Sequence, residues 1–363
     1  MQALHIHAGP TAMRHIARHG LQAADVGVVA GAAGGPKGLI LGPLDRFLFG
    51  DWLHGGAQAV HLVGASIGAW RMATACLDEP VAAFRRLEHD YIHQHYEPPP
   101  GRSRPTPEQV SDRFGASLRD FFGGHEAAVL GQRRYRLHVL ASRGRHLLAR
   151  ESAWRTPLGY AAAYLCNAVN RRALGAWLER VVLSSPGAVL PFDPGDFPTR
   201  RVALTPANLL PALQASCSIP FVLRAVADLP GSAAGAHWDG GITDYHLHLD
   251  YARAARPEPG SGPLVLYPHF QQAVVPGWLD KALRWRHRPT GFLDNLVLLA
   301  PRPDWVARLP GGKLPDRTDF TRFGADLPAR VAAWSAAVSE SRRLADEFQA
   351  WLARPDPGQL RPL

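Results

Sequence analysis

A serine in a Gly-x-Ser-x-Gly turn is the clearest chemical feature of this sequence. Ser66 lies between Gly64 and Gly68, where an apolar stretch meets a segment of small residues. A turn of this kind between a strand and a helix forces the central side chain outward, and the flanking glycines remove Cβ atoms that would clash with neighbouring backbone. The pattern predicts that Ser66 is a nucleophile.

A glycine-rich segment over residues 31–38 is the second chemical feature, and it follows an apolar run. Its spacing differs from nucleotide-binding loops, because Gly38 rather than Ser or Thr follows Lys37, and Ala33 stands where a dinucleotide motif needs glycine. The N–H groups of Gly34 and Gly35 could instead face the oxyanion that forms when a serine attacks an ester. This role requires the loop to lie beside Ser66.

A nucleophilic serine also needs a proton acceptor. The 17 histidines include four candidates downstream of Ser66, none of which has a diagnostic context: His237, His246, His248 and His269. Asp239 is the better candidate, because Gly240 and Gly241 follow it and allow a sharp turn that presses the acid against a neighbouring loop. The alternative interpretation is an ordinary Asp-Gly turn.

The elements around these residues predict an α/β fold. Residues 25–30 read as a buried strand, followed by the glycine loop, a helix with one apolar face, and a second strand over 59–63 that ends at the serine turn. This strand, helix, strand, helix order is typical of a mostly parallel sheet with helices on both sides. The helix after the loop is expected to place Ile40, Leu44, Phe47 and Leu48 on one face.

Further elements follow along the chain. We predict a helix around 81–91, a helical stretch over 157–178, and strands at 135–141, 181–184, 202–204 and 263–267. Residues 327–352 are predicted to form one long amphipathic helix that caps the fold. We therefore expect an α/β domain over 1–275 and a helical C-terminal extension over 276–363 that packs on the same domain.

The composition excludes several classes of protein. With 46% hydrophobic and 20% charged residues, the 363-residue chain has ordinary globular composition. Three widely spaced cysteines indicate neither a disulfide framework nor a thiolate zinc site, so no metal or cofactor is expected. The start of the chain does not resemble a signal peptide and no apolar run of 18 residues occurs, which predicts a cytoplasmic protein.

The net charge of +9 comes from scattered arginines rather than from one basic run. No nucleic-acid partner is therefore expected. Peripheral contact with an anionic membrane surface fits the charge better, and we expect Trp52, Leu53 and Trp70 to contribute to it because they lie near the presumed site.

Four segments in this order resemble the patatin-like phospholipase family. They are the glycine loop at 33–38, the serine turn at 64–68, the stretch at 212–221 and the Asp-Gly-Gly turn at 239–241. The third segment is similar to the family's Ala-Ser-x-x-Ile-Pro stretch and precedes the Asp-Gly-Gly turn by about twenty residues. The resemblance covers residues 25–250 and departs from the family pattern at Ala33 and at 242–246.

The resemblance implies a three-layer α/β/α hydrolase that acts on acyl esters of lipids, as a phospholipase A or lysophospholipase, through a serine–aspartate dyad without a catalytic histidine. Ser66 would be the nucleophile and Asp239 the base, with the N–H groups of Gly34 and Gly35 as the oxyanion hole. The supporting positions are Lys37, in place of the family's usual basic residue, Gly38, Gly240 and Gly241, with Gly64 and Gly68 forming the elbow.

Two alternatives remain open at this stage. One is a histidine-dependent α/β-hydrolase, although its serine usually follows several strands and Ser66 follows about two. The other is a non-catalytic protein that binds lipid or nucleotide and keeps the loop and the elbow as architecture only.

Overall fold

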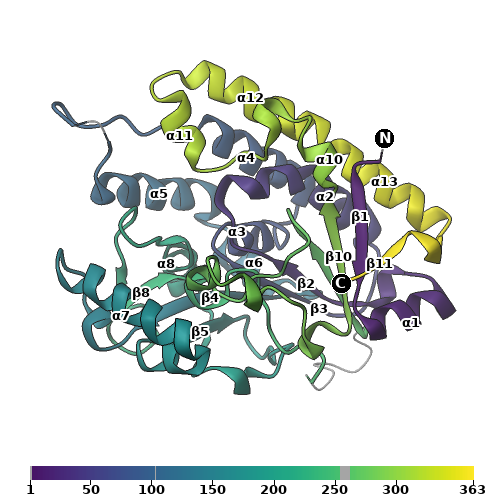
Figure 1. Cartoon of the computed structure of the whole chain (residues 1–363), viewed down its shortest axis with the longest axis horizontal. Helices are drawn as coiled ribbons and strands as arrows, with labels where there is room; N and C mark the ends of the chain where they lie inside the picture. The colour runs from purple at the N-terminus through teal and green to yellow at the C-terminus, as the bar shows by residue number, and fades with distance from the viewer. Residues whose placement is uncertain (1, 103, 254–261) are drawn as a thin grey trace.

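The computed structural model describes residues 2–102, 104–253 and 262–363. In this part of the chain eleven strands form one mixed, mostly parallel sheet (Figure 1). They are β1 (Leu4–Ala8), β2 (Val26–Gly31), β3 (Val60–Ala65), β4 (Tyr135–Gly144), β5 (Leu178–Ser184), β6 (Thr199–Ala203), β7 (Val226–Ala227), β8 (Ala236–Asp239), β9 (Leu264–Pro268), β10 (Leu296–Pro301) and β11 (Leu360–Pro362). The order is β11-β1-β10-β9-β2-β3-β4-β5-β6, while β8 also pairs with β4 and β7 pairs with β8.

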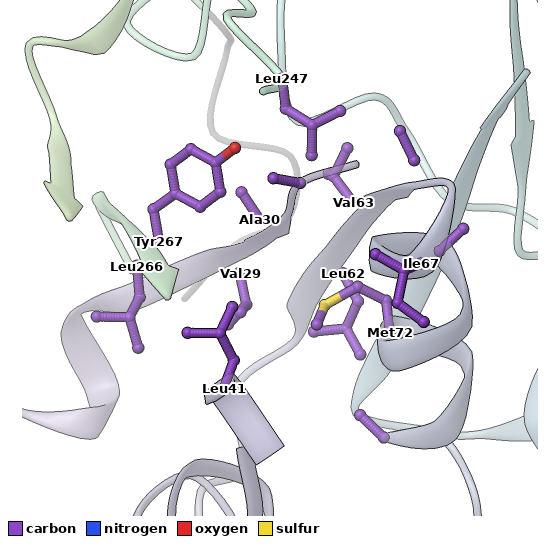
Figure 2. Close-up of a cluster of buried hydrophobic side chains, with 14 of the residues drawn as sticks. Val29, Ala30, Leu41, Leu62, Val63, Ile67, Met72, Leu247, Leu266 and Tyr267 are labelled. Atoms are coloured by element: carbon purple, nitrogen blue, oxygen red, sulfur yellow. The ribbon is translucent and has the colours of Figure 1, made fainter. Parts of the chain in front are cut away.

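The central strands are apolar on both faces, as expected for parallel strands covered by helices. Every residue of β2, β3 and β9 is buried. Figure 2 shows how successive residues point to opposite faces of the sheet, in the pairs Val29 and Ala30, Leu62 and Val63, and Leu266 and Tyr267. Leu41 and Met72 cover the first face and Leu247 the second, so core side chains fill both sides of the sheet.

The helices lie on both sides of this sheet. They are α1 (Pro10–His19), α2 (Gly42–Phe47), α3 (Ile67–Thr74), α4 (Pro80–His93), α5 (Pro107–Phe122), α6 (Glu126–Gly131), α7 (Arg155–Val169), α8 (Pro206–Cys217), α9 (Gly241–Asp244), α10 (Pro303–Val306), α11 (Thr318–Phe323), α12 (Leu327–Glu340) and α13 (Arg342–Ala353). In Figure 1, α2, α4, α12 and α13 lie above the central strands, α1 lies at the lower right near β1 and β11, and α7 lies at the lower left. The predicted α/β class with a mostly parallel sheet is confirmed.

The predicted strands correspond to β2, β3, β4, β5, β6 and β9, and the helix predicted around 81–91 is α4. The helix predicted after the glycine loop is divided into a 3-10 segment over Gly35–Leu41, the short α2, and a π-helical turn over Leu48–Trp52. Pro43 contributes to this division, because it has no N–H to continue the preceding hydrogen-bond pattern.

The prediction of one long helix over 327–352 is wrong. The chain turns at Ser341, between α12 and α13. The Ser341 hydroxyl donates a hydrogen bond to the Val338 carbonyl oxygen at 2.7 Å, and such local bonding by a serine side chain competes with a regular helix. Trp334 of α12 packs against Phe320, and Phe348 of α13 packs against Phe47.

The C-terminal segment 276–363 supplies strands as well as helices. The fully buried β10 lies between β1 and β9, and β11 pairs with β1. The apolar run of β10 carries no alternation that would distinguish a strand from a buried helix. The segment expected to be a helical cap is therefore part of the central sheet.

Two of the three residues expected at a membrane contact are not exposed to solvent. Leu53 and Trp70 are buried, and Trp52 is half-buried with its ring against Phe348. The assignment was wrong for Leu53 and Trp70, because both fill the core; the Trp70 ring packs against Phe114 and Phe121 of α5. Among the described residues, no helix combines the length and the apolar character needed to cross a membrane.

Candidate active site

Ser66 sits at the junction between β3 and α3 with a strained backbone. Its φ of 56° lies in the left-handed region, which a serine adopts only when its surroundings enforce it. A Cβ on Gly68 would lie 1.8 Å from the carbonyl oxygen of Gly31, and one on Gly64 would lie 2.6 Å from the Ala69 nitrogen. Both glycines are therefore required for α3 to start directly against the ends of β2 and β3.

Asp239 lies beside Ser66 although 173 residues separate them. The Ser66 hydroxyl donates a hydrogen bond to Asp239 Oδ2 at 2.7 Å, and both residues are buried. The sheet brings them together, because β4 pairs with β3 along one part of its length and with β8 along another. The Gly241 N–H donates to Asp239 Oδ1 at 2.7 Å and fixes the other carboxylate oxygen.

The end of α8 holds both residues in place. The Ser66 N–H donates to Ser216 Oγ at 2.9 Å, and that hydroxyl donates to the Leu140 carbonyl oxygen at 2.6 Å. The Asp239 N–H donates to the Ser218 carbonyl oxygen at 2.9 Å. The segment 212–221, which only a family resemblance indicated in the sequence, positions the serine and the aspartate in the structure.

Burial is the largest influence on the Asp239 carboxyl and raises its pKa above the ordinary value of 3.8. The Ser66 hydrogen bond, the positive charge of Arg317, the Gly241 N–H and the charge of Lys281 act in the opposite direction. A carboxylate with a raised pKa is a better proton acceptor than an exposed aspartate.

The glycine loop reaches the same place from the neighbouring strand, since Gly31 of β2 pairs with Gly64 of β3. Gly34 lines a cleft together with Ser66, and a Cβ on Gly34 would lie 2.4 Å from the Phe270 ring. Gly35 is buried with a φ of 58°. The N–H of Ala33, the residue before Gly34, donates a hydrogen bond to the Tyr245 carbonyl oxygen at 3.0 Å. This N–H therefore serves the fold.

The remaining predicted positions support this arrangement. Gly38 packs against Ile67, the first residue of α3. The Gly240 N–H donates to the Ser216 carbonyl oxygen at 3.1 Å. Lys37 lines the cleft with its ammonium 5.3 Å from the centre of the Phe270 ring, and burial lowers its pKa.

The cleft holds about 680 Å³ of empty volume, part of which is open to solvent. Apolar and aromatic side chains form much of its wall: Ile219, Pro220, Ile242, Tyr245 and Trp278. Two cations from the C-terminal segment, Lys281 and Arg317, also line it. The sequence analysis missed both, because neither lies in a motif and only the fold brings them to the serine.

Lys281 is the more unusual of these two cations. Its ammonium lies 3.9 Å from the centre of the Tyr245 ring. Burial, together with the positive charges of Arg317 and Lys37, lowers its pKa to about 8. The three cations Lys37, Lys281 and Arg317 therefore line this cleft together with two acidic residues, Asp239 beside the serine and Asp316.

The candidate histidines have other partners. The two ring nitrogens of His237 contact the Gly235 carbonyl oxygen and Ser232 Oγ, at 3.0 and 2.9 Å. His246 Nδ1 contacts the Ala273 carbonyl oxygen, and His269 Nδ1 contacts Gln271. His248 Nε2 lies 3.3 Å from the Thr290 hydroxyl. No histidine is among the cleft-lining residues of the described chain.

The described residues contain no group of three or more His, Cys, Asp or Glu side chains arranged to hold a metal ion. The geometry instead supplies a serine hydroxyl, a hydrogen-bonded carboxylate and a glycine loop at one cleft. No model of a known protein family matches the chain, and no characterised protein is significantly similar to it in sequence.

Proposed function

We propose that this protein is a serine hydrolase of acyl esters, of the patatin-like type, with lipids or related esters as substrates. Ser66 is the nucleophile and Asp239 is its base. The observation that carries this proposal is the 2.7 Å hydrogen bond from the Ser66 hydroxyl to Asp239 Oδ2, in a cleft bordered by the glycine loop.

In the first half of the reaction, Ser66 Oγ attacks the ester carbonyl carbon while Asp239 Oδ2 accepts the hydroxyl proton. The N–H groups of Gly34 and Gly35 stabilise the negative charge that develops on the carbonyl oxygen. The tetrahedral species then breaks its bond to the leaving alcohol, which takes the proton from Asp239. An acyl group remains on Ser66 Oγ.

In the second half, a water molecule attacks the acyl carbon and gives its proton to Asp239. The bond between the acyl carbon and Ser66 Oγ breaks, and Asp239 returns the proton to the serine oxygen. The carboxylic acid leaves and the initial state is restored. One residue thus serves as base and then as acid in both halves.

Two observations favour this mechanism over the alternatives. A histidine-dependent hydrolase needs an imidazole beside the serine, whereas the neighbour here is Asp239. A protein that used the elbow only as architecture would not require a serine at a left-handed φ of 56°. Backbone strain of this kind is concentrated at functional sites.

The cleft wall supports a substrate with both an apolar and an anionic part. The apolar wall suits an acyl chain, and Lys37, Lys281 and Arg317 suit a phosphate or carboxylate close to the ester.

Labelling with a fluorophosphonate probe tests the nucleophile, with Ser66→Ala as the control. We expect covalent labelling of the wild type, none of the variant, and turnover of short p-nitrophenyl esters or defined lysophospholipids only by the wild type. Absence of both labelling and turnover in folded wild-type protein would overturn the proposal. Labelling and turnover that survive Ser66→Ala would assign the chemistry to another residue.

A further inference from the structure

The outward face of α7 is apolar along its whole length. Trp154, Leu158, Leu165 and Val169 are 60%, 54%, 65% and 88% exposed. Their spacing of four, seven and four residues places them on one side of the helix. Between Arg155 and the arginines that follow Asn170, α7 carries no charged residue.

The opposite face of α7 already packs against the protein. Tyr160 and Ala163 belong to a core cluster with Trp238. Asn167 donates a side-chain hydrogen bond to Asp280 Oδ1 at 2.8 Å. The exposed apolar face is therefore a second hydrophobic face on a helix whose core side is occupied.

This apolar face continues onto the segment that borders the cleft. Phe221 and Val222 are 53% and 44% exposed and directly follow Ile219 and Pro220, which line the cleft. Phe221 has a φ of 68°, a strained conformation for a bulky residue, and its ring lies 6.0 Å from that of Tyr160.

Trp285 extends the apolar face at the C-terminal end of α7. It is 64% exposed, and the neighbouring Arg286 donates hydrogen bonds to the Ala168 carbonyl oxygen and to Asp280. We define the α7 surface as the residues Trp154, Leu158, Leu165, Val169, Phe221, Val222 and Trp285. In Figure 1, α7 lies at the lower left edge of the molecule, on the opposite side from α12 and α13.

Arginines flank the α7 surface. Exposed Arg150 precedes the helix, exposed Arg172 follows it, and exposed Arg284 and Arg288 lie on either side of Trp285. The nearby carboxylate of Glu151 accepts the backbone N–H of Ala225 at 3.0 Å. Apolar side chains with cations at their border are typical of surfaces that bind at the interface of anionic lipid.

We propose that the α7 surface docks on an anionic lipid bilayer, with the mouth of the cleft beside the membrane. Monomeric proteins seldom expose contiguous apolar surface of this kind without a partner. A bilayer with anionic headgroups complements both the apolar centre and the arginines at its border. A second copy of the chain would instead bring two sets of arginines together, which opposes association. The docking goes beyond the ester chemistry, because membrane binding needs no turnover.

Co-sedimentation with vesicles tests this docking. The vesicles contain phosphatidylcholine and phosphatidylglycerol in equal amounts, or phosphatidylcholine alone. We expect wild type to bind the mixed vesicles and to bind the neutral vesicles more weakly. The neutral double variant Leu158→Gln, Leu165→Gln should bind at least about tenfold more weakly, because it removes two apolar side chains that the membrane would bury.

The matched control is Ala332→Gln with Ala336→Gln, two exposed alanines on α12 at the opposite side of the molecule. It should bind like wild type, and so should Ser66→Ala, which separates docking from hydrolysis. Trp285→Gln, outside α7, should also weaken binding, which keeps the test valid if the double variant misfolds. Circular dichroism verifies that each variant is folded.

Three results would overturn the docking. One is absence of binding by wild type to either vesicle. Another is equal binding by wild type, the double variant and Trp285→Gln. The third is a dimer in analytical ultracentrifugation that the double variant abolishes without any vesicle binding, which would assign the α7 surface to contact between two copies.

Discussion

Two buried aspartates, Asp239 at the end of β8 and Asp244 at the end of α9, have opposite surroundings. Asp244 accepts two hydrogen bonds from the Arg180 guanidinium, at 2.6 and 2.8 Å, and Arg180 is fully buried. Asp239 accepts a hydroxyl from Ser66 and an N–H from Gly241. Within the described chain, no lysine or arginine nitrogen lies within ion-pair distance of Asp239.

The comparison separates a structural carboxylate from one suited to proton transfer. The Arg180 guanidinium in direct contact orients the Asp244 carboxylate through two charge-assisted hydrogen bonds, so that this pair serves the packing of β5 against α9. Asp239 has its cations, Arg317 and Lys281, at a distance, and its direct partner is a hydroxyl with a proton to give. Asp239 and Asp244 are similarly buried and lie five residues apart, and their different partners give them different functions.

Asp239→Asn is expected to have the largest effect. The amide preserves the size of the side chain but cannot accept the Ser66 proton, so kcat/KM for a p-nitrophenyl ester should fall by about 10²–10⁴-fold, the usual contribution of a positioned base. The melting temperature should remain close to that of wild type, because no buried cation loses its partner. Activity within tenfold of wild type in the folded variant would remove Asp239 from the mechanism.

Asp244→Asn should show the reverse pattern. It leaves the buried Arg180 charge with Asp196 as its remaining carboxylate, and breaking such a buried pair costs about 3–5 kcal/mol of unfolding free energy. Urea denaturation measures this loss, and turnover per folded molecule should change little. Asp304→Asn is the control, since Asp304 pairs with Arg302 at the surface and should matter little. An equal loss of unfolding free energy in Asp244→Asn and Asp304→Asn would contradict the structural role of Asp244.

Arg317→Gln should have the smallest effect and a defined sign. The reaction needs ionised Asp239, so activity falls as the pH drops through the Asp239 pKa. Arg317 lowers that pKa, and its removal should therefore raise it and move the acidic limb of the kcat/KM profile to higher pH. At pH 7 the rate with a neutral ester should change by less than tenfold, equivalent to about 1.4 kcal/mol.

Arg322→Gln, an exposed arginine on α11, is the matched control for this profile and should leave the limb in place. A limb that moves to lower pH in Arg317→Gln would show that Arg317 does not act on Asp239 through its charge.

The residues with local backbone requirements were predictable from the sequence. Gly64 and Gly68 bracket Ser66 because the turn leaves no space for a Cβ, and Gly34 adjoins Phe270 for the same reason. The central strands were predictable as well, since runs such as 60–65 are apolar at every position except His61. The prediction failed at β10, whose short apolar run has no distinctive period, and at Ser341, where a single side chain divides a helical pattern.

The sequence by itself determined the chemical groups of the site: a serine on a tight turn, an aspartate before two glycines and a loop of N–H donors. These depend on neighbours within a few residues. Only the tertiary structure decided that Ser66 lies 2.7 Å from Asp239, that Lys281 and Arg317 face them, that Trp70 is buried, and that the apolar face of α7 is exposed. Each of these depends on how strands distant in sequence pair in one sheet, which a local pattern does not encode.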